Sequence, residues 1–176
     1  MQYISRYASP LGGILLAADD AGLFGLWFEG QKYFARCLQP PFEERLTAPL
    51  AAARRWLDAY FSGGRPTLDV PLHLIGTPFQ KDVWQALCEI PYGRTATYGE
   101  VAQTVASHRC APVSARAVGN AVGRNAISLI VPCHRVVGAN GSLTGYAGGI
   151  DRKLRLLALE HADTHALFAP GQKAAP

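Results

Sequence analysis

Cysteine, histidine and arginine stand in succession at residues 133–135, directly after an apolar run and a proline. The run over residues 127–131 predicts a buried strand. Pro132 fixes its own φ and donates no backbone hydrogen bond, so it predicts a turn that holds Cys133 at a constrained corner. A thiol attacks as its thiolate, and a neighbouring imidazole with Arg135 close by favours that form. The segment therefore predicts a nucleophile at the end of a strand.

A structural role for Cys133 is the alternative, because free cysteines are among the most buried residue types and often serve as small core residues. Packing alone, however, gives no reason for Pro, Cys, His and Arg in succession. The inward spacing of a last helix, over residues 151–161, could deliver Glu160 to His134. Glu160 would then orient the imidazole and stabilise its cation. Adjacent side chains point different ways, so a bridging water is expected between thiol and imidazole.

Three further helices and a turn precede that last helix in the second part of the chain. A helix is expected over residues 77–90, because it opens with a capping threonine followed by proline. A second is expected over residues 97–106 and a third over residues 114–124. An Asn-Gly pair at residues 140–141 predicts a β-hairpin. Two short helices joined by a turn and followed by a hairpin indicate a winged-helix domain.

The first part of the chain has a different pattern. Residues 2–30 alternate and turn like a meander of three strands, and residues 49–61 have helical spacing. An extended connection with an internal proline follows and leads to a domain boundary near Gly76. The expected organisation is a scaffold domain over residues 1–76, a second domain over residues 77–161 and a mobile tail over residues 162–176.

The composition is that of a soluble globular protein, with 49% apolar and 17% charged residues. No apolar run is long enough to span a bilayer and no secretory signal opens the chain, so we expect a cytoplasmic protein without a membrane partner. Four widely spaced cysteines without a CxxC pair argue against a disulfide framework, and Cys37 with His73 makes a poor zinc ligand set. Residues 77–161 hold nine Lys and Arg against five Asp and Glu, and this surplus of four positive charges accounts for the whole net charge of +4. A basic surplus of this kind suits contact with phosphates.

Three motifs in the second part resemble a known family. They are PCHRVVG at residues 132–138, GYAGG at residues 145–149 and RKLRLLALE at residues 152–160. Together they resemble the active-site signature of bacterial O6-alkylguanine-DNA alkyltransferases, also called methylated-DNA-protein-cysteine methyltransferases. The resemblance covers most of residues 76–160. It implies an α+β fold in which a small ribonuclease-H-like α/β domain precedes a winged-helix, DNA-binding domain.

The resemblance implies DNA repair by direct transfer of an alkyl group from O6 of guanine to Cys133, once per molecule and without a cofactor. Activity on O4-alkylthymine stays open. Tyr98 would protonate the leaving guanine, because a phenol near the ring can supply that proton. Arg116 matches the family's intercalating arginine, which enters through the minor groove of double-stranded DNA while the damaged base is flipped out. Asn125 matches the hinge asparagine that ties the recognition helix to the active-site turn.

Two further groups complete the site that the resemblance implies. Small or helix-initiating residues would lie against the DNA backbone: Thr97, Ser114, Ala115, Ala117 and Gly119. Pocket residues would surround the flipped base: Pro132, Arg135, Val136, Tyr146, Ala147 and Gly148. The backbone N–H of Ala147 would meet guanine O6, and the carbonyls of Cys133 and Val136 would accept from the guanine amino group. A monomer without a bound metal is expected.

Two features depart from the family pattern. Ala126 stands where the family commonly has proline, and the loop over residues 107–113 is longer than expected. Three other classes of protein stay open: a DNA-binding module without catalysis, a winged-helix transcription regulator and a cysteine hydrolase. The first would lack the nucleophile that Cys133 provides, the second needs a dimerisation or effector element, and the third usually takes its histidine from a distant segment.

Overall fold

The computed structural model describes residues 1–169, and its contacts divide the chain into two compact units. Unit 1 comprises residues 1–75 together with residues 126–130, and unit 2 comprises residues 76–125 together with the chain from residue 131 onward. The segment predicted to end in a nucleophile therefore begins in unit 1 and ends in unit 2. Both units mix helices and strands, which confirms the predicted α+β class.

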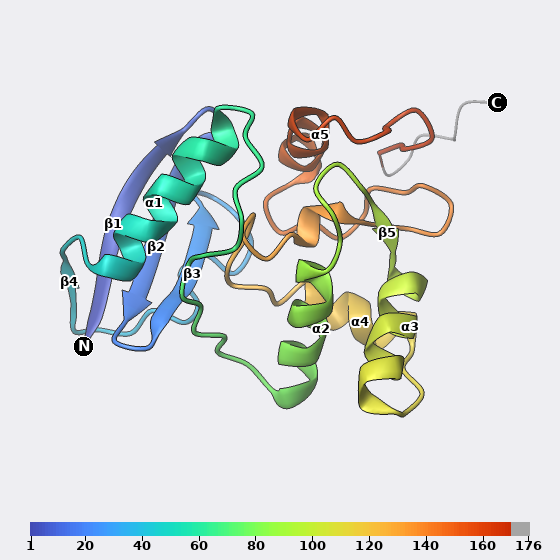
Figure 1. The fold of residues 1–176 in the computed structure, drawn as a ribbon, viewed down its shortest axis with the longest axis horizontal. Helices are drawn as coiled ribbons and strands as arrows, with labels where there is room; N and C mark the ends of the chain where they lie inside the picture. Colours follow the sequence, from blue (N-terminus) through green and yellow to red (C-terminus); the bar gives the residue numbers. More distant parts are fainter. Residues whose placement is uncertain (170–176) are drawn as a thin grey trace. The chain divides into compact units, whose positions relative to one another are not determined.

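Unit 1 is a four-stranded sheet with one helix packed on it (Figure 1). The strands run antiparallel in the order β3-β2-β1, and the short β4 pairs with β1 in parallel at the edge. The predicted meander and helix are confirmed, whereas β4 was not predicted, because its three residues are all exposed and carry no buried pattern. The element bounds are β1 Gln2–Ser9, β2 Gly12–Asp19, β3 Gly22–Phe28, β4 Phe42–Glu44 and α1 Ala48–Phe61.

Residues 126–130 also belong to unit 1, but they do not form the predicted buried strand. Ile127 makes a single parallel bridge with Leu26, whose N–H donates to the Ala126 carbonyl at 2.8 Å. The chain then turns at once, because Leu129 has a φ of 69° and the Ile130 N–H bonds the Ser128 carbonyl at 2.9 Å. The predicted burial is correct and the predicted conformation is wrong, since an apolar run without a period does not distinguish a strand from a buried turn.

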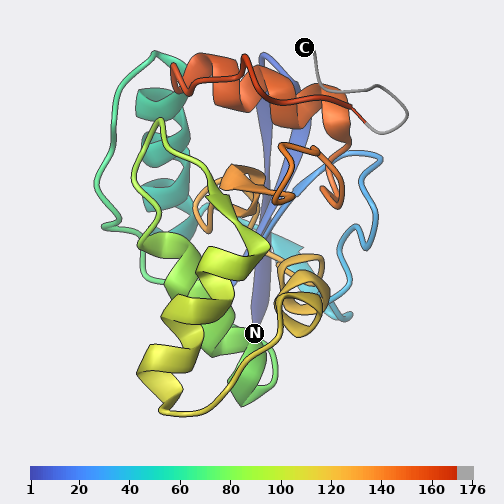
Figure 2. The same cartoon turned by 90° about the vertical axis from the view of Figure 1, so that its right-hand side faces the viewer.

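The described part of unit 2, up to residue 169, contains four α-helices, one turn of 3-10 helix and a two-stranded parallel sheet. Helices α2, α3 and α4 pack against one another, as Figure 2 shows in green, yellow and gold. Capping boxes at Thr77 and Thr97 start the first two, and the Ser114 hydroxyl caps the third, which confirms the predicted starts. The bounds are α2 Pro78–Cys88, β5 Ala96–Thr97, α3 Tyr98–Arg109, α4 Ala115–Val122, β6 Val136–Val137 and α5 Ile150–Leu159.

The predicted Asn-Gly turn is present without the strands of a regular hairpin in the described chain. The Gly138 N–H donates to the Ser142 carbonyl at 2.8 Å, and the Gly141 N–H donates to the Gly138 carbonyl at 2.9 Å. Instead of a second wing strand, Phe168 forms a parallel bridge with Ser142. Part of the tail expected to be mobile therefore contacts this turn, and residues 170–176 of it lie outside the described residues. No helix within residues 1–169 has the length and hydropathy to cross a bilayer.

Candidate active site

The candidate nucleophile lies in one turn of 3-10 helix, Cys133–Arg135, whose three residues are all buried. The Cys133 N–H donates to the Val131 carbonyl at 2.8 Å, and the Val136 N–H donates back to the Cys133 carbonyl. Val136 then enters β6 and pairs with Ala96 of β5. Backbone hydrogen bonds thus hold the turn on both sides. This agrees with the constrained corner that Pro132 predicts.

The Cys133 thiol is buried, and the side chain of Asn125 contacts it. Asn125 Nδ2 lies 3.2 Å from Sγ and donates to the Val131 carbonyl at 2.9 Å. Burial raises the pKa of the thiol, while the Asn125 hydrogen bond, the positive charge of Lys153 and the backbone N–H groups of the turn oppose that rise. The resting group is therefore a thiol at neutral pH, so it needs a base before it can attack.

His134 and Glu160 form a pair with no exposure to solvent. His134 Nε2 and Glu160 Oε1 are 2.6 Å apart. Burial raises the pKa of Glu160, but the hydrogen bonds from His134 and Arg135 and the positive charge of Arg135 outweigh it and hold that pKa well below its usual range. Burial also lowers the pKa of His134, against the opposing pull of Glu160. The pair is therefore a carboxylate and a neutral imidazole.

The carboxylate decides which imidazole nitrogen can act as a base. A carboxylate only accepts hydrogen bonds, so the Nε2 atom of His134 must carry the ring proton and donate it to Glu160. The lone pair then belongs to Nδ1, which is buried and forms no hydrogen bond to the described residues. A neutral imidazole with an uncommitted Nδ1 on the residue next to Cys133 is suited to take the thiol proton.

Arg135 and Gly93 complete the shell around the Glu160 carboxylate. Arg135 donates from Nε to Oε2 at 2.8 Å and from Nη2 to Oε1 at 3.1 Å, and its Nη1 donates to the Ile90 carbonyl at 2.7 Å. The Gly93 N–H donates to Oε2 at 3.1 Å. The expectation that Arg135 favours the Cys133 thiolate is wrong, because its guanidinium is directed at the carboxylate. No motif in the sequence marked Gly93 as a site residue.

Tyr98 and Tyr146 present two protonated phenols to the same region. The Tyr98 hydroxyl donates to the Thr144 carbonyl at 3.1 Å. Burial and the charge of Cys133 raise the pKa of both phenols, that of Tyr146 well above its usual value. The Tyr146 hydroxyl is buried and makes no hydrogen bond within residues 1–169. A Cβ at Gly145 would come 2.7 Å from the Tyr98 hydroxyl, and the φ of +86° there also favours glycine.

The candidate DNA-binding residues lie on α3 and α4. Arg116 and Ala115 are exposed in the first turn of α4, and Ala117 is half-buried behind them. A Cβ at Gly119 would lie in ordinary contact, 3.8 Å from the Tyr98 ring, so α4 runs close to the residue that starts α3. The exposed start of α4 can therefore meet DNA while the same helix packs beside the candidate proton donor.

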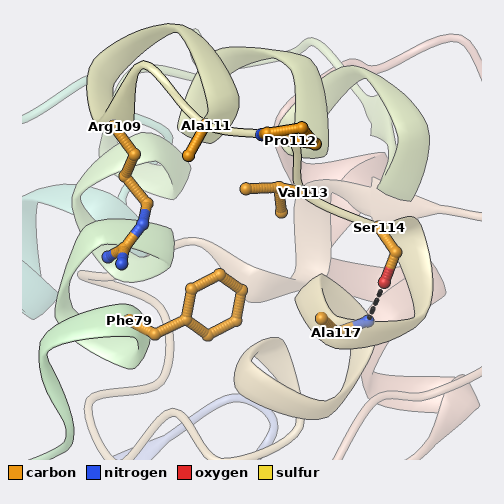
Figure 3. A pocket seen from close by; sticks show the side chains of 7 residues that line it. All are labelled: Phe79, Arg109, Ala111, Pro112, Val113, Ser114 and Ala117. Carbon is orange, nitrogen blue, oxygen red and sulfur yellow. Dashed lines mark hydrogen bonds between the residues drawn. The ribbon is translucent and has the colours of Figure 1, made fainter.

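An open pocket of about 600 Å³ lies beside the start of α4 (Figure 3). One side comes from the long loop after α3, which begins later than predicted because α3 continues to Arg109 before Cys110 adopts a left-handed φ of 51°. Arg109 pairs with Asp82 and stacks on Phe79. The lining residues are Phe79, Arg109, Ala111, Pro112, Val113, Ser114 and Ala117.

The remaining expected site residues flank the active-site turn. Pro132 and Val136 are buried on either side of it, and Gly148 packs so closely on Tyr146 that a Cβ there would lie 2.5 Å from the ring. Ala147, which lies between Tyr146 and Gly148 in the sequence, is half-buried. Ala126, which stands where the family commonly has proline, accepts a hydrogen bond within unit 1 through its backbone carbonyl.

Sequence reasoning missed Lys153, the one fully buried lysine of the described chain. Its position carried a signal, because residue 153 falls three after Ile150 and four before Leu157, on the face of α5 that was predicted to point inward. A lysine on a buried helix face is rare unless its charge has partners.

Comparisons with known proteins decide the family. Residues 2–74 match the model of the 6-O-methylguanine DNA methyltransferase ribonuclease-like domain, and residues 78–162 match that of the 6-O-methylguanine DNA methyltransferase DNA-binding domain. The chain belongs to this methyltransferase family. The resemblance inferred from the three motifs is thereby confirmed, and so is the order of a ribonuclease-like domain before a DNA-binding domain.

Named relatives support the assignment over nearly the whole chain. The methylated-DNA--protein-cysteine methyltransferase of Methanosarcina acetivorans is 44% identical over 172 residues, covering 90% of this chain and 97% of the relative. The enzyme of that name from Mycolicibacterium paratuberculosis is 46% identical over 158 residues, covering 90% and 92%. The structure of Mycobacterium tuberculosis OGT in complex with DNA superposes with a TM-score of 0.80 at 44% identity, covering 90% and 92%.

The buried pair predicts how stability depends on pH. Folding lowers the pKa of both groups, so their contribution to the free energy of unfolding is complete above the ordinary histidine pKa of about 6.5. The contribution falls below that pH, because His134 takes up a proton in the unfolded chain. It falls further below about pH 4.3, where Glu160 takes up a proton in the unfolded chain. Urea unfolding from pH 7.5 to 4 measures this loss. Glu160→Gln should be less stable by about 3–5 kcal/mol at pH 7.5, because a buried pair is broken, and its curve should be shallower below pH 5.

The exposed Glu44 on β4 offers a matched control. Glu44→Gln should follow the wild-type curve within about 0.5 kcal/mol, because surface substitutions have small effects. Parallel acid curves for wild type and Glu160→Gln would show that Glu160 is not a low-pKa carboxylate in the folded protein.

Proposed function

We propose that this protein repairs alkylated DNA by transferring an alkyl group from O6 of guanine to Cys133, once per molecule. The observation that carries the proposal is the buried Glu160–His134 pair at 2.6 Å, which leaves Nδ1 of His134 as a base beside a buried thiol. Membership in the methyltransferase family and the DNA-binding domain over residues 78–162 support the substrate class. The named relatives are methylated-DNA--protein-cysteine methyltransferases.

The reaction begins with removal of the thiol proton. His134 Nδ1 takes it through a bridging water, and the imidazolium that forms is stabilised by the Glu160 carboxylate. The Asn125 amide, 3.2 Å from Sγ, stabilises the thiolate. Because the resting thiol has a raised pKa, the thiolate forms only when the base accepts its proton, which protects Cys133 from other electrophiles.

Alkyl transfer follows as an in-line displacement. The sulfur of Cys133 forms a bond to the alkyl carbon while the bond from that carbon to guanine O6 breaks, and the electron pair leaves with guanine. Tyr98 keeps its proton at neutral pH and gives it to the leaving base. Tyr98 regains a proton as the imidazolium loses one, so the thiol proton has in net passed to guanine. The thioether at Cys133 is stable, so each molecule acts once and needs no cofactor.

DNA is bound through α4 at the minor groove of the duplex. Arg116 enters the base stack and holds open the gap left by the flipped nucleotide, since a base inside the duplex cannot reach a buried thiol. The small residues Ala115 and Ala117 let the helix approach the sugar-phosphate edge. The pocket is completed by the backbone N–H of Ala147 toward guanine O6 and by the carbonyls of Cys133 and Val136 toward its amino group. The protein works as a monomer in the cytoplasm.

Transfer of the alkyl group predicts a permanent change in protein mass. On mixing with a duplex that carries one O6-methylguanine, the intact mass should rise by one methyl group, and the added mass should map to the Cys133 peptide. Cys133→Ser should gain no mass while it still binds the lesion duplex, because the DNA-binding helices are unchanged. Intact-protein and peptide mass spectrometry measure both results.

Two exposed cysteines provide the control, since Cys88→Ser and Cys110→Ser should gain the methyl group like the wild type. Methyl transfer in Cys133→Ser, or added mass on another cysteine, would overturn the assignment of the nucleophile. Tight lesion binding with no mass change in the wild type would indicate a recognition module without catalysis.

The position of Arg116 predicts a separate effect on DNA. Arg116→Ala should bind the lesion duplex at least about tenfold more weakly and transfer methyl more slowly from duplex DNA, because the flipped base is no longer replaced in the stack. Transfer from the free base O6-benzylguanine should change little, because no base has to be flipped. Fluorescence anisotropy and single-turnover mass spectrometry measure these quantities.

Arg55 is an exposed arginine on α1 and provides a charge-matched control. The affinity of Arg55→Ala for the lesion duplex should lie within about twofold of the wild type, because the electrostatic part of the affinity comes from charges that contact the DNA phosphates. Equal losses in both variants would show that net charge, rather than insertion of Arg116, determines the affinity.

A further inference from the structure

We propose that residues 166–168, the tail segment, determine which alkyl groups the active site accepts. The tail segment holds in place the loop over residues 138–148, which carries part of the expected substrate pocket, and so restricts the size of the group that reaches Cys133. The inference deepens the proposed function and rests on it, because it concerns the same transfer reaction. None of the three motifs that carry the family resemblance extends beyond Glu160 into this segment.

The tail segment pairs with the loop through its backbone. Phe168 and Ser142 form a parallel bridge. The Leu143 N–H donates to the Phe168 carbonyl at 3.0 Å, and the Phe168 N–H donates to the Gly141 carbonyl at 3.2 Å. Adjacent parallel strands make hydrogen bonds in this pattern. The tail segment therefore takes the place of the second wing strand that the Asn-Gly turn predicted.

An apolar contact supports the same pairing. Leu167 packs against a buried cluster of Val137, Leu143 and Leu157, which come from β6, the loop and α5. Its N–H donates to the Thr164 carbonyl at 3.0 Å, which turns the chain toward the loop. Leu143 thus receives both a hydrogen-bond acceptor and an apolar neighbour from the tail segment, so the loop cannot move away without losing both.

The loop depends on this pairing because its own backbone is permissive. Gly141 and Gly145 have φ values of 85° and 86°, in the left-handed region that favours glycine. Glycine has more conformational freedom to lose than any other residue, so a loop with two such positions is weakly ordered by itself. Gly141 also leaves room for the tail segment, since a Cβ there would collide with the Ala166 carbonyl oxygen.

The residue that the tail segment holds lies next to the candidate site in the chain. Leu143 precedes Thr144, whose carbonyl accepts from the Tyr98 hydroxyl at 3.1 Å. The expected pocket residues follow at positions 146–148. The two backbone bonds of the tail segment therefore position the start of the stretch that contacts the candidate proton donor and surrounds the flipped base.

Close packing in this stretch makes its position decide the size of the alkyl group. A Cβ at Gly145 would come 2.7 Å from the Tyr98 hydroxyl, and one at Gly148 would come 2.5 Å from the Tyr146 ring. Packing of this density leaves no room for a benzyl group unless the loop moves. Movement breaks the bonds to the tail segment, so these bonds oppose transfer of a bulky group and do not oppose transfer of methyl.

The test compares single-turnover transfer from duplexes that are identical except for one O6-benzylguanine or one O6-methylguanine, followed by intact-protein mass spectrometry. Phe168→Pro removes the N–H that donates to Gly141, and Gly141→Ala displaces the Ala166 carbonyl. In both variants the ratio of the benzyl rate to the methyl rate should rise at least about fivefold above wild type, because moving the loop no longer breaks these bonds.

Amide hydrogen exchange measures the loop itself and needs no DNA. The peptide over residues 138–146 should exchange at least about threefold faster in Phe168→Pro and Gly141→Ala than in the wild type, because the loop opens more often without the tail segment. Thermal denaturation reports whether each variant is folded, and either variant alone is sufficient for the comparison of rates.

Two matched substitutions separate the backbone bonds from other effects. Phe168→Ala removes the ring but keeps both backbone groups of residue 168. Gly63→Ala introduces the same kind of backbone strain, at a φ of 82°, in unit 1, where a Cβ would have no described neighbour within 4 Å. Both variants should keep the rate ratio within about twofold of the wild type, since neither removes a bond between the tail segment and the loop.

An unchanged ratio in Phe168→Pro, with methyl transfer intact, would overturn the proposal and leave residues 166–168 as a packing element. A rise in Gly141→Ala alone would also overturn it, because the effect would then belong to the Asn-Gly turn. Failure of the proposed function gives a different result. If the wild type transfers neither group while the loop of Phe168→Pro exchanges faster, alkyl transfer and the role in specificity are both rejected, and only the structural pairing of tail segment and loop is retained.

Discussion

A buried carboxylate must have its charge satisfied, and the organisation of the active site follows from how Glu160 meets that requirement. Glu160 has no solvent to compensate its charge, so it collects hydrogen bonds from His134, from two nitrogens of Arg135 and from the Gly93 backbone. Each of these bonds also positions something else. The bond to His134 fixes which ring nitrogen is free, and those to Arg135 hold the last residue of the turn that begins at Cys133. The hydrogen bonds that satisfy the Glu160 charge therefore also fix the base and the turn beside the nucleophile.

The thiol itself is kept unreactive until a substrate arrives. Burial raises the pKa of Cys133, and only the Asn125 amide, the backbone N–H groups of the turn and the charge of Lys153 oppose that rise. A protein that can act once gains from such an arrangement, because a free thiolate would react with other electrophiles before it met damaged DNA. Activation by a neighbouring base restricts the reactive state to the moment when an alkyl group is in line with the sulfur.

The sequence predicted much of this arrangement, and particular residues show why the rest escaped it. Thr77, Thr97 and Ser114 marked three helix starts because capping is a local property of the backbone, and the spacing of α5 placed Glu160 at His134. Residues 127–131 were misread as a strand, because burial without a period does not specify a conformation. Arg135 was expected to act on the thiol, since adjacency in sequence does not reveal the direction of a side chain. Gly93 and Lys153 each contact a partner that lies far away in the sequence, and no local pattern predicts such contacts.

The central claim is that Glu160 leaves the lone pair of His134 on Nδ1, where it can take the thiol proton. The most direct test is ¹⁵N NMR of histidine-labelled protein at pH 7.5, with His134 assigned by comparison with His134→Gln. The account predicts a proton on Nε2 and a pyridine-like Nδ1, both unchanged as the pH falls to about 6, because burial holds the imidazole neutral. A proton on Nδ1, or a fully protonated ring at pH 7.5, would contradict it, since His134 could then accept nothing from Cys133.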